Sequence, residues 1–170
     1  MENIENFELG ETGIQVPLGG RADNRLATLA MAQQAKRSLR IMTRDLDAPI
    51  YNTRDFTDAV TKLATRSKHS IIRILIQDSS NVVVNGHRIV ELAYRLSSKI
   101  NLRKTCNEYQ NHNEAFLIAD DVGFIHRKIA DRYEGIVNFK DSLQARNLAK
   151  FFDEVWEKSE PDPELRRLYL

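Results

Sequence analysis

Two histidines and one carboxylate are the side chains of this sequence best suited to chemistry. His112 and Glu114 stand two residues apart just before an apolar run, and His126 follows after an acidic turn. A histidine can act near neutral pH as a nucleophile, a general base or a metal ligand. Two histidines with one carboxylate also form a ligand set that suits zinc or iron. Which of these roles is open depends on the elements that position the three side chains.

Alternating helix and strand patterns surround this motif. Apolar residues at helical spacing predict a helix capped by Thr53, and the β-branched run Ile71–Ile76 predicts a buried strand. Further strands are expected at 39–43, at 100–102 and as a hairpin over 115–126, and further helices from Asp23 or Asn24, over 89–96 and from 141 or 142 to 156. Parallel crossovers early in the chain and a hairpin late in it predict a single α/β domain with a mixed sheet flanked by helices.

The composition of the chain is typical of a globular protein in a reducing compartment. It has 170 residues, 42% of them apolar and 29% charged, and its net charge of +1 indicates no particular partner. The lone Cys106 and the lack of an apolar run of ~18 residues predict a cytoplasmic protein without a membrane partner. No glycine-rich phosphate loop is present, so we expect no cofactor. We expect a mobile or loosely docked arm over 1–20, a domain over 21–159 and a tail over 160–170.

The register of the predicted hairpin decides which side chains can meet. A tight turn over Asp120–Gly123 places Phe116 opposite Arg127, so that Glu114 and Arg127 become diagonal neighbours. We expect either an ion pair between these two or two separately solvated charges. The same register turns His126 to the other face, about 10 Å along the strand from Glu114, so no metal site is predicted. A shift of one residue in the register would undo these placements.

The stretch from His112 to Asp120 resembles the HxKxxxxD signature of the phospholipase D superfamily. The histidine keeps its place, but Glu114 stands in the lysine position, Ala119 stands in the aspartate position, and Asp120 comes one residue late. The predicted element order over 21–159 also resembles one repeat of a phospholipase D-like domain. The resemblance implies that fold. Single-repeat members of the superfamily pair two chains across the motif, which implies a homodimer.

The altered motif implies that the reaction of the superfamily is lost. There the histidine attacks phosphorus and the lysine neutralises the phosphate, whereas Glu114 carries the opposite charge. At about 4 Å and an effective dielectric near 20, this exchange moves the interaction energy by roughly 8 kcal/mol as an upper estimate. We therefore expect a pseudoenzyme that acts as a binding or regulatory module for a phosphate-bearing ligand, a nucleic acid or a protein. The alternatives are a residual phosphodiesterase or nuclease using His112, and a pure protein-interaction scaffold.

A second resemblance bears on the partner. The segments Ala130–Gly135 and Trp156–Leu165 are similar to stretches of an uncharacterised bacterial domain family found alone or beside GNAT-type acetyltransferases. This similarity implies an acetyltransferase as a candidate protein partner.

Polar clusters follow two of the predicted strands. Arg44 and Asp47 come after the strand at 39–43, where functional groups of open α/β sheets gather. With the motif and the residues after the hairpin, they complete the candidate ligand-binding set: Arg44, Asp47, His112, Glu114, Arg127, Arg132, Tyr133, Glu134 and Asn138. Either the arginines grip a carboxylate or a phosphate bidentately, or these charges pair with one another and hold loops in place.

Basic side chains between residues 62 and 104 could track a nucleic-acid backbone. They are Lys62, Arg66, Lys68, His69, Arg73, Arg88, Arg95, Lys99, Arg103 and Lys104. The alternative is ordinary surface charge. Apart from Tyr94, the aromatic side chains of a single-strand binding platform are nearly absent from this part of the chain.

Overall fold

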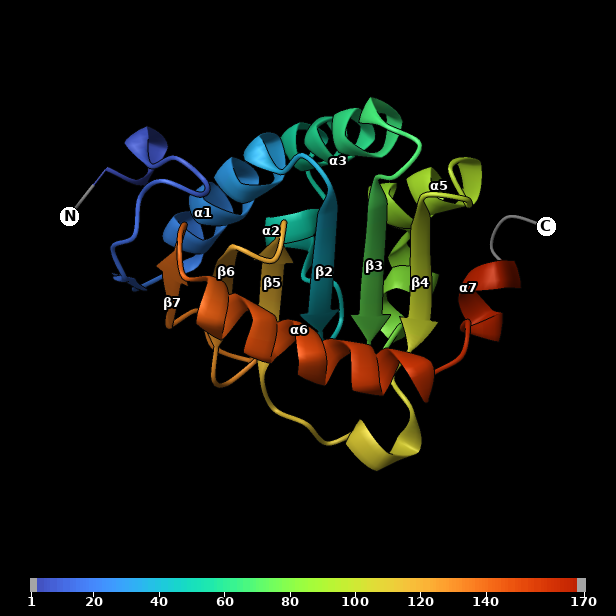
Figure 1. Cartoon of the computed structure of the whole chain (residues 1–170). Helices are drawn as coiled ribbons and strands as arrows, with labels where there is room; N and C mark the ends of the chain where they lie inside the picture. The colour runs from blue at the N-terminus through green and yellow to red at the C-terminus, as the bar shows by residue number, and fades with distance from the viewer. Residues whose placement is uncertain (1–2, 168–170) are drawn as a thin grey trace.

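A seven-stranded mixed sheet lies at the centre of the structure, a computed structural model that describes residues 3–167 (Figure 1). The strands are β1 (Val16–Leu18), β2 (Ser38–Thr43), β3 (Ile71–Ile76), β4 (Ile100–Lys104), β5 (Ala115–Ala119), β6 (Gly123–Arg127) and β7 (Gly135–Asn138). Their order across the sheet is β1-β7-β6-β5-β2-β3-β4. The neighbours β2, β3 and β4 are parallel, and the remaining pairs are antiparallel. This arrangement confirms the predicted mixed α/β sheet.

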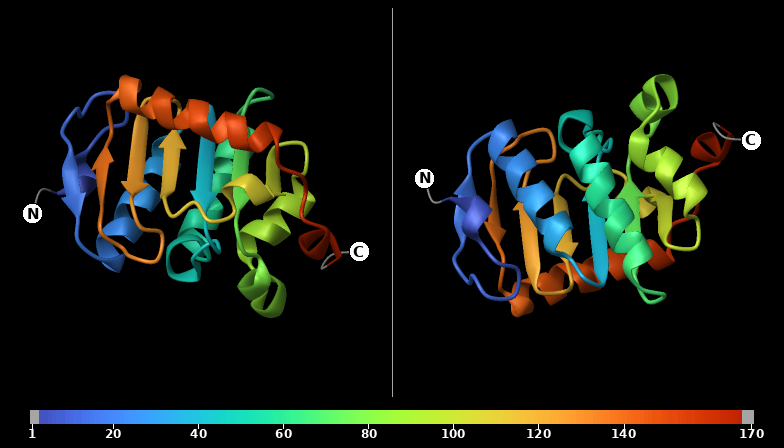
Figure 2. Two further views of the ribbon diagram at one scale, coloured as in Figure 1. Left: turned by 90° about the horizontal axis from the view of Figure 1, so that it is seen from below. Right: turned by 90° about the horizontal axis from the view of Figure 1, so that it is seen from above.

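Helices cover both faces of the sheet (Figure 2). One face carries α1 (Arg21–Gln34), α3 (Arg54–Arg66) and α5 (Arg88–Arg95), and α6 (Ser142–Glu157) crosses the other. The connections contain α2 (Ala48–Tyr51), α4 (Ser80–Asn85), α7 (Pro163–Arg167) and the 3-10 turns η1 (Ile4–Asn6) and η2 (Asn107–Tyr109). Over residues 3–167, none of these helices has both the length and the apolar character that a membrane crossing requires.

Each face of the sheet has its own apolar core. Successive side chains of a strand point to opposite faces, so Ile41 and Leu117 pack on the side of α1 and α3, whereas Met42 and Phe116 pack against α6. The predicted cap of α3 is confirmed, since the Thr53 hydroxyl oxygen accepts a hydrogen bond from the backbone N–H of Phe56. The predicted apolar face of α3 is buried.

Helix α1 begins earlier than its polar residues predict. Its N-cap is Gly20, which has an extended backbone and offers no side-chain cap. The predicted caps, Asp23 and Asn24, lie inside the first turn. Asn24 is buried, and its side-chain amide donates to the carbonyl oxygens of Gly20 and Tyr133. This side chain links α1 to the loop before β7, so tertiary contacts override the capping preference.

The N-terminal segment packs on the domain, in contrast to the loosely docked arm that its glycines predict. Within the described residues 3–20, β1 forms an edge strand paired with β7. Ile4 and Phe7 are buried, and Phe7 meets the ring of Phe139 edge-on at 5.7 Å between centroids. The few large apolar side chains of the segment hold it, because nearly all of their surface is removed from water.

The predicted C-terminal tail docks as well, as far as it is described. The backbone N–H of Lys104 donates to the carbonyl oxygen of Glu160 at 2.8 Å. The Ser79 hydroxyl donates to the buried carboxylate of Asp162 at 2.6 Å, and Leu165 is buried. Contacts therefore cross both predicted domain boundaries; residues 1–2 and 168–170 lie outside the described part of the chain.

Asp120 joins the β5–β6 turn to the start of β2. Its carboxylate accepts hydrogen bonds from the backbone N–H groups of Lys36, Arg37 and Ser38 at 2.8–3.0 Å. Asp120 and Asp121 both have positive φ, at 54° and 57°, a conformation that aspartate tolerates better than most residues. Asp120 therefore has a structural role at the far end of β5 from His112.

We expect the substitution Asp120→Ala to lower the free energy of unfolding by about 1–2 kcal/mol, because three N–H groups lose a charged acceptor but remain partly accessible to water. Asp120→Asn keeps one acceptor oxygen and should lose less. Urea unfolding measures both, with Asp58→Ala on the exposed side of α3 as a control. An Asp120→Ala variant as stable as the control would contradict this role.

His87 is buried, whereas its place before a helix suggests a solvated side chain. Its Nε2 donates to the carbonyl oxygen of Leu46 at 3.0 Å, and its Nδ1 accepts from the N–H of Ile89 at 3.1 Å. Both ring nitrogens are satisfied in the neutral form. Burial lowers the pKa of His87 to about 4.

This depressed pKa makes folding stability depend on pH. The unfolded chain binds a proton near pH 6.5 and the folded one near pH 4, so His87 contributes stability above pH 6.5 that is lost as the pH falls towards 4. Between neutral pH and pH 4.5, wild type should lose about 2 kcal/mol more than a His87→Asn variant, whose side chain can still cap α5. Urea titrations at several pH values test this. The exposed His69→Asn variant should behave like wild type, and equal pH profiles for all three would refute the prediction.

Candidate functional site

The β5–β6 hairpin is shifted by one residue from the predicted register. Ala119 pairs with Gly123 around a three-residue loop, whereas the prediction assumes two loop residues between Asp120 and Gly123. Phe116 therefore lies opposite His126, and Arg127 lies opposite Ala115. Because side chains alternate along a strand, the shift exchanges the faces of His126 and Arg127.

The shift brings His112, Glu114 and His126 together on the face covered by α6. The Glu114 Oε2 atom lies 3.5 Å from His112 Nε2 and 3.3 Å from His126 Nε2. The His126 side chain is 11% exposed and that of Glu114 is 38% exposed. Neither Nε2 atom has a hydrogen-bond partner among the described residues. The carboxylate thus stands between two imidazole rings.

Residues of three other elements hold His112 in place. The side-chain amide of Gln77, directly after β3, donates to the His112 carbonyl oxygen, and the His112 N–H donates to the Tyr109 carbonyl oxygen at 3.1 Å. The ring of Phe151 on α6 lies 4.8 Å from the imidazole ring. Sequence reasoning missed Gln77, although a polar residue directly after a buried strand is a usable signal.

The charges of this cluster disfavour an anion. In the part of the chain that the structure describes, no lysine or arginine forms an ion pair with Glu114. A phosphate oxygen placed beside His112 would face the carboxylate of Glu114. Asp120 is at the opposite end of β5, and Ala119 is buried in the core.

The prediction of no metal site rested on His126 pointing away from Glu114. That placement is wrong, because His126 shares the face of His112 and Glu114. Even so, no cluster of histidine, cysteine, aspartate or glutamate within residues 3–167 has the geometry of a metal site. The proximity of the three side chains follows from the register and from packing under α6.

The predicted ion pair between Glu114 and Arg127 is also wrong. Arg127 is buried on the other face, where its guanidinium donates to the carbonyl oxygens of Arg132 and Ala130 at 2.8 and 2.5 Å. It lies 5.1 Å from the centre of the Tyr133 ring. Arg127 therefore fixes the loop between β6 and β7 and does not face the motif.

Arg44 and Asp47 also hold this loop. Arg44 Nη1 donates to both carboxylate oxygens of Asp131 at 2.8 and 2.9 Å, and its Nη2 donates to the side chain of Asn113 at 3.3 Å. Burial and a hydrogen bond to Asp47 raise the pKa of the Tyr133 hydroxyl. These contacts match the alternative in which the charges pair with one another, because Asp131 and Asn113 already engage the two terminal nitrogens of Arg44.

The remaining residues of the predicted ligand-binding set lie in different parts of the structure. Arg132 and Glu134 are exposed and line a cavity of about 530 Å³ together with His126 and Lys128. Asn138 is buried, and its side-chain oxygen accepts from the backbone N–H of Lys140. It contributes to the turn after β7 and lies apart from the motif.

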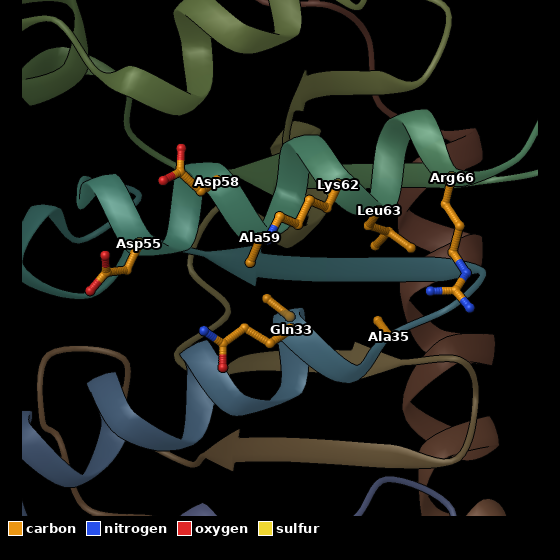
Figure 3. A pocket seen from close by; sticks show the side chains of 9 residues that line it. Gln33, Ala35, Asp55, Asp58, Ala59, Lys62, Leu63 and Arg66 are labelled. Atoms are coloured by element: carbon orange, nitrogen blue, oxygen red, sulfur yellow. The ribbon is translucent and has the colours of Figure 1, made fainter.

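The basic side chains between residues 62 and 104 do not form one stripe. Arg73 and Arg103 lie over Trp156 on the α6 face, at 5.6 and 4.3 Å from the ring centre. Lys62 and Arg66 line a groove of about 430 Å³ between α1 and α3 on the other face, and two aspartates share that groove (Figure 3). Lys99 lies at the amino end of β4, where its ammonium group donates to the carbonyl oxygens of residues 67 and 68.

Solved structures of the phospholipase D family share this fold. Nuc from Salmonella typhimurium is 18% identical, with a TM-score of 0.62 over 88% of this chain and 99% of its own. NucT from Helicobacter pylori is 13% identical, with a TM-score of 0.63 over 88% of this chain and 99% of its own. At these identities the likeness establishes the phospholipase D-like fold alone.

A third similar structure is TrmBL2, an archaeal chromatin protein with a novel mode of DNA binding. It is 20% identical, with a TM-score of 0.63 over 87% of this chain, and the match spans only 54% of the TrmBL2 chain. No protein of the curated set matches the sequence. The model of a family of domains of unknown function, DUF7931, matches residues 20–168. The chain therefore belongs to the DUF7931 family.

Proposed function

We propose that this protein is a phospholipase D-fold domain that acts by binding and does not hydrolyse phosphodiesters. The observation that carries the proposal is the position of Glu114, whose carboxylate lies within 3.5 Å of the Nε2 atoms of His112 and His126. Glu114 occupies the lysine position of the motif, and the charge that would stabilise a phosphorane-like transition state is reversed.

The size of this effect favours loss of activity. Exchanging an attractive for a repulsive contact at about 4 Å costs several kcal/mol even in a partly hydrated site. Each 1.36 kcal/mol is a factor of about ten in rate, so several decades of rate would be lost. Ala119 also departs from the motif of the superfamily, because it stands in the aspartate position.

One observation favours the alternative of a residual phosphodiesterase. A histidine beside a carboxylate is a common arrangement for a nucleophile or a general base, and His112 has both Glu114 and a second imidazole close by. This arrangement could orient His112, but it would not neutralise the substrate. We therefore rank it second.

The ligand class that we favour is a nucleic acid, in line with the likeness to the DNA-binding TrmBL2. Because Glu114 presents a carboxylate beside His112, we propose that this ligand binds outside the remnant motif. A homodimer across the motif and an acetyltransferase partner stay predictions from the resemblances. A pure protein-interaction scaffold stays an alternative function.

Assays of highly purified protein with bis(p-nitrophenyl) phosphate and with plasmid DNA test the loss of hydrolysis. We expect wild type, His112→Ala and His69→Ala to give the same background rate, because His112 lacks an electrostatic partner for the phosphate. A rate that His112→Ala lowers at least about tenfold, with His69→Ala unchanged, would refute the proposal; such a change equals about 1.4 kcal/mol of transition-state stabilisation.

A further inference from the structure

The amino-terminal ends of β2, β3 and β4 lie side by side, at the top of these strands in Figure 1. The segments that lead into the three strands are basic. We call Lys36, Arg37, Arg66, Lys68 and Lys99 the basic rim. Lys36 and Arg37 precede β2. Arg66 ends α3, Lys68 lies between α3 and β3, and Lys99 precedes β4.

Backbone hydrogen bonds fix these segments next to one another. The N–H of Ile71 donates to the carbonyl oxygen of Arg37 at 3.0 Å, and the N–H of Ile72 donates to that of Lys99 at 2.8 Å. The Lys99 ammonium group also donates to the carbonyl oxygen of Lys68 at 2.6 Å. Two strand spacings separate Arg37 from Lys99, which is about 10 Å. The segments that carry the five cations therefore lie next to one another at the amino-terminal ends of the three strands.

The positive charge of the rim is only partly compensated. Within residues 3–167, no ion pair joins a rim side chain to a carboxylate. Asp120 subtracts one charge from the five of the rim, because the backbone N–H groups of Lys36, Arg37 and Ser38 that donate to it are neutral. Asp121 adds no free charge, because it pairs with Arg40 at 2.5 Å. Four of the five side chains are exposed, and Lys99 is half-buried. A net charge of only +1 for the chain thus hides a concentrated positive surface.

We propose that the basic rim is a docking surface for the sugar–phosphate backbone of a nucleic acid. About 10 Å of duplex carries about six phosphate charges, a density that the five cations of the rim can match. The rim segments contain no aromatic side chain to stack on bases, so binding is to phosphates and is not sequence-specific. They also contain no large apolar side chain to enter a membrane, which favours a nucleic acid over an anionic lipid surface.

This surface is separate from the remnant motif. Phe116 pairs with Met42 near the carboxyl end of β2, and Glu114 lies just before it in the chain, whereas the rim lies at the amino end of β2. The inference rests on the proposed function only in requiring a binding role. It does not depend on the loss of hydrolysis.

Fluorescence anisotropy with a labelled random-sequence DNA duplex tests the inference. We expect binding that weakens roughly 100-fold between about 50 and about 200 mM salt, as release of counterions from about four phosphates requires. The triple variant Lys36→Glu, Arg37→Glu and Lys68→Glu should bind at least about tenfold more weakly at low salt. The control triple variant Lys140→Glu, Arg146→Glu and Lys150→Glu has the same change in charge on exposed residues around α6 and should bind like wild type.

Several outcomes would overturn the rim as a nucleic-acid site. These are no binding by wild type at low salt, equal binding by the rim variant and wild type, equal losses in the two triple variants, or rim-dependent binding to phosphatidylserine vesicles without binding to DNA. Circular dichroism and urea unfolding confirm that each variant is folded. His112-dependent cleavage of the probe would refute the proposed function and leave a rim-dependent affinity standing, so the two failures are distinguishable.

Discussion

The pairing of Ala119 with Gly123 closes the β5–β6 hairpin over three residues, and the positions of the candidate side chains follow from it. In this register His126 joins His112 and Glu114 beneath α6, while Arg127 enters the opposite core. A register shifted by one residue would expose an arginine to the motif and remove a histidine from it. The electrostatics of the site thus depend on the length of a surface turn.

The sequence is sufficient for the fold class and for much of the core. The alternation of helical and strand periods predicts the mixed sheet, and the Thr53 cap with the apolar face of α3 is correct in detail. These features depend on local spacing and on burial, which a sequence states directly. The alteration of the phospholipase D motif at Glu114 stays a prediction from the resemblance.

Features that depend on contacts between residues far apart in the chain could not be predicted from the sequence. The pairing of β1 with β7 joins residues more than a hundred positions apart, and Asn24 leaves its capping role for a carbonyl oxygen at Tyr133. His87 is buried because Leu46 offers it an acceptor. The guanidinium group of Arg44, a candidate ligand-binding group, pairs with the carboxylate of Asp131. In each case a partner far along the chain satisfies a polar group that local sequence would leave to solvent or ligand.

The surroundings of Trp156 have a practical consequence for spectroscopy. This residue is the only tryptophan of the chain, it is nearly buried, and it stacks on Phe152 while two guanidinium groups lie over its indole ring. Its emission spectrum therefore reports on the packing interface, or seam, between α6 and the sheet. Separation of that seam would hydrate the indole and shift its emission to longer wavelength, without any attached label.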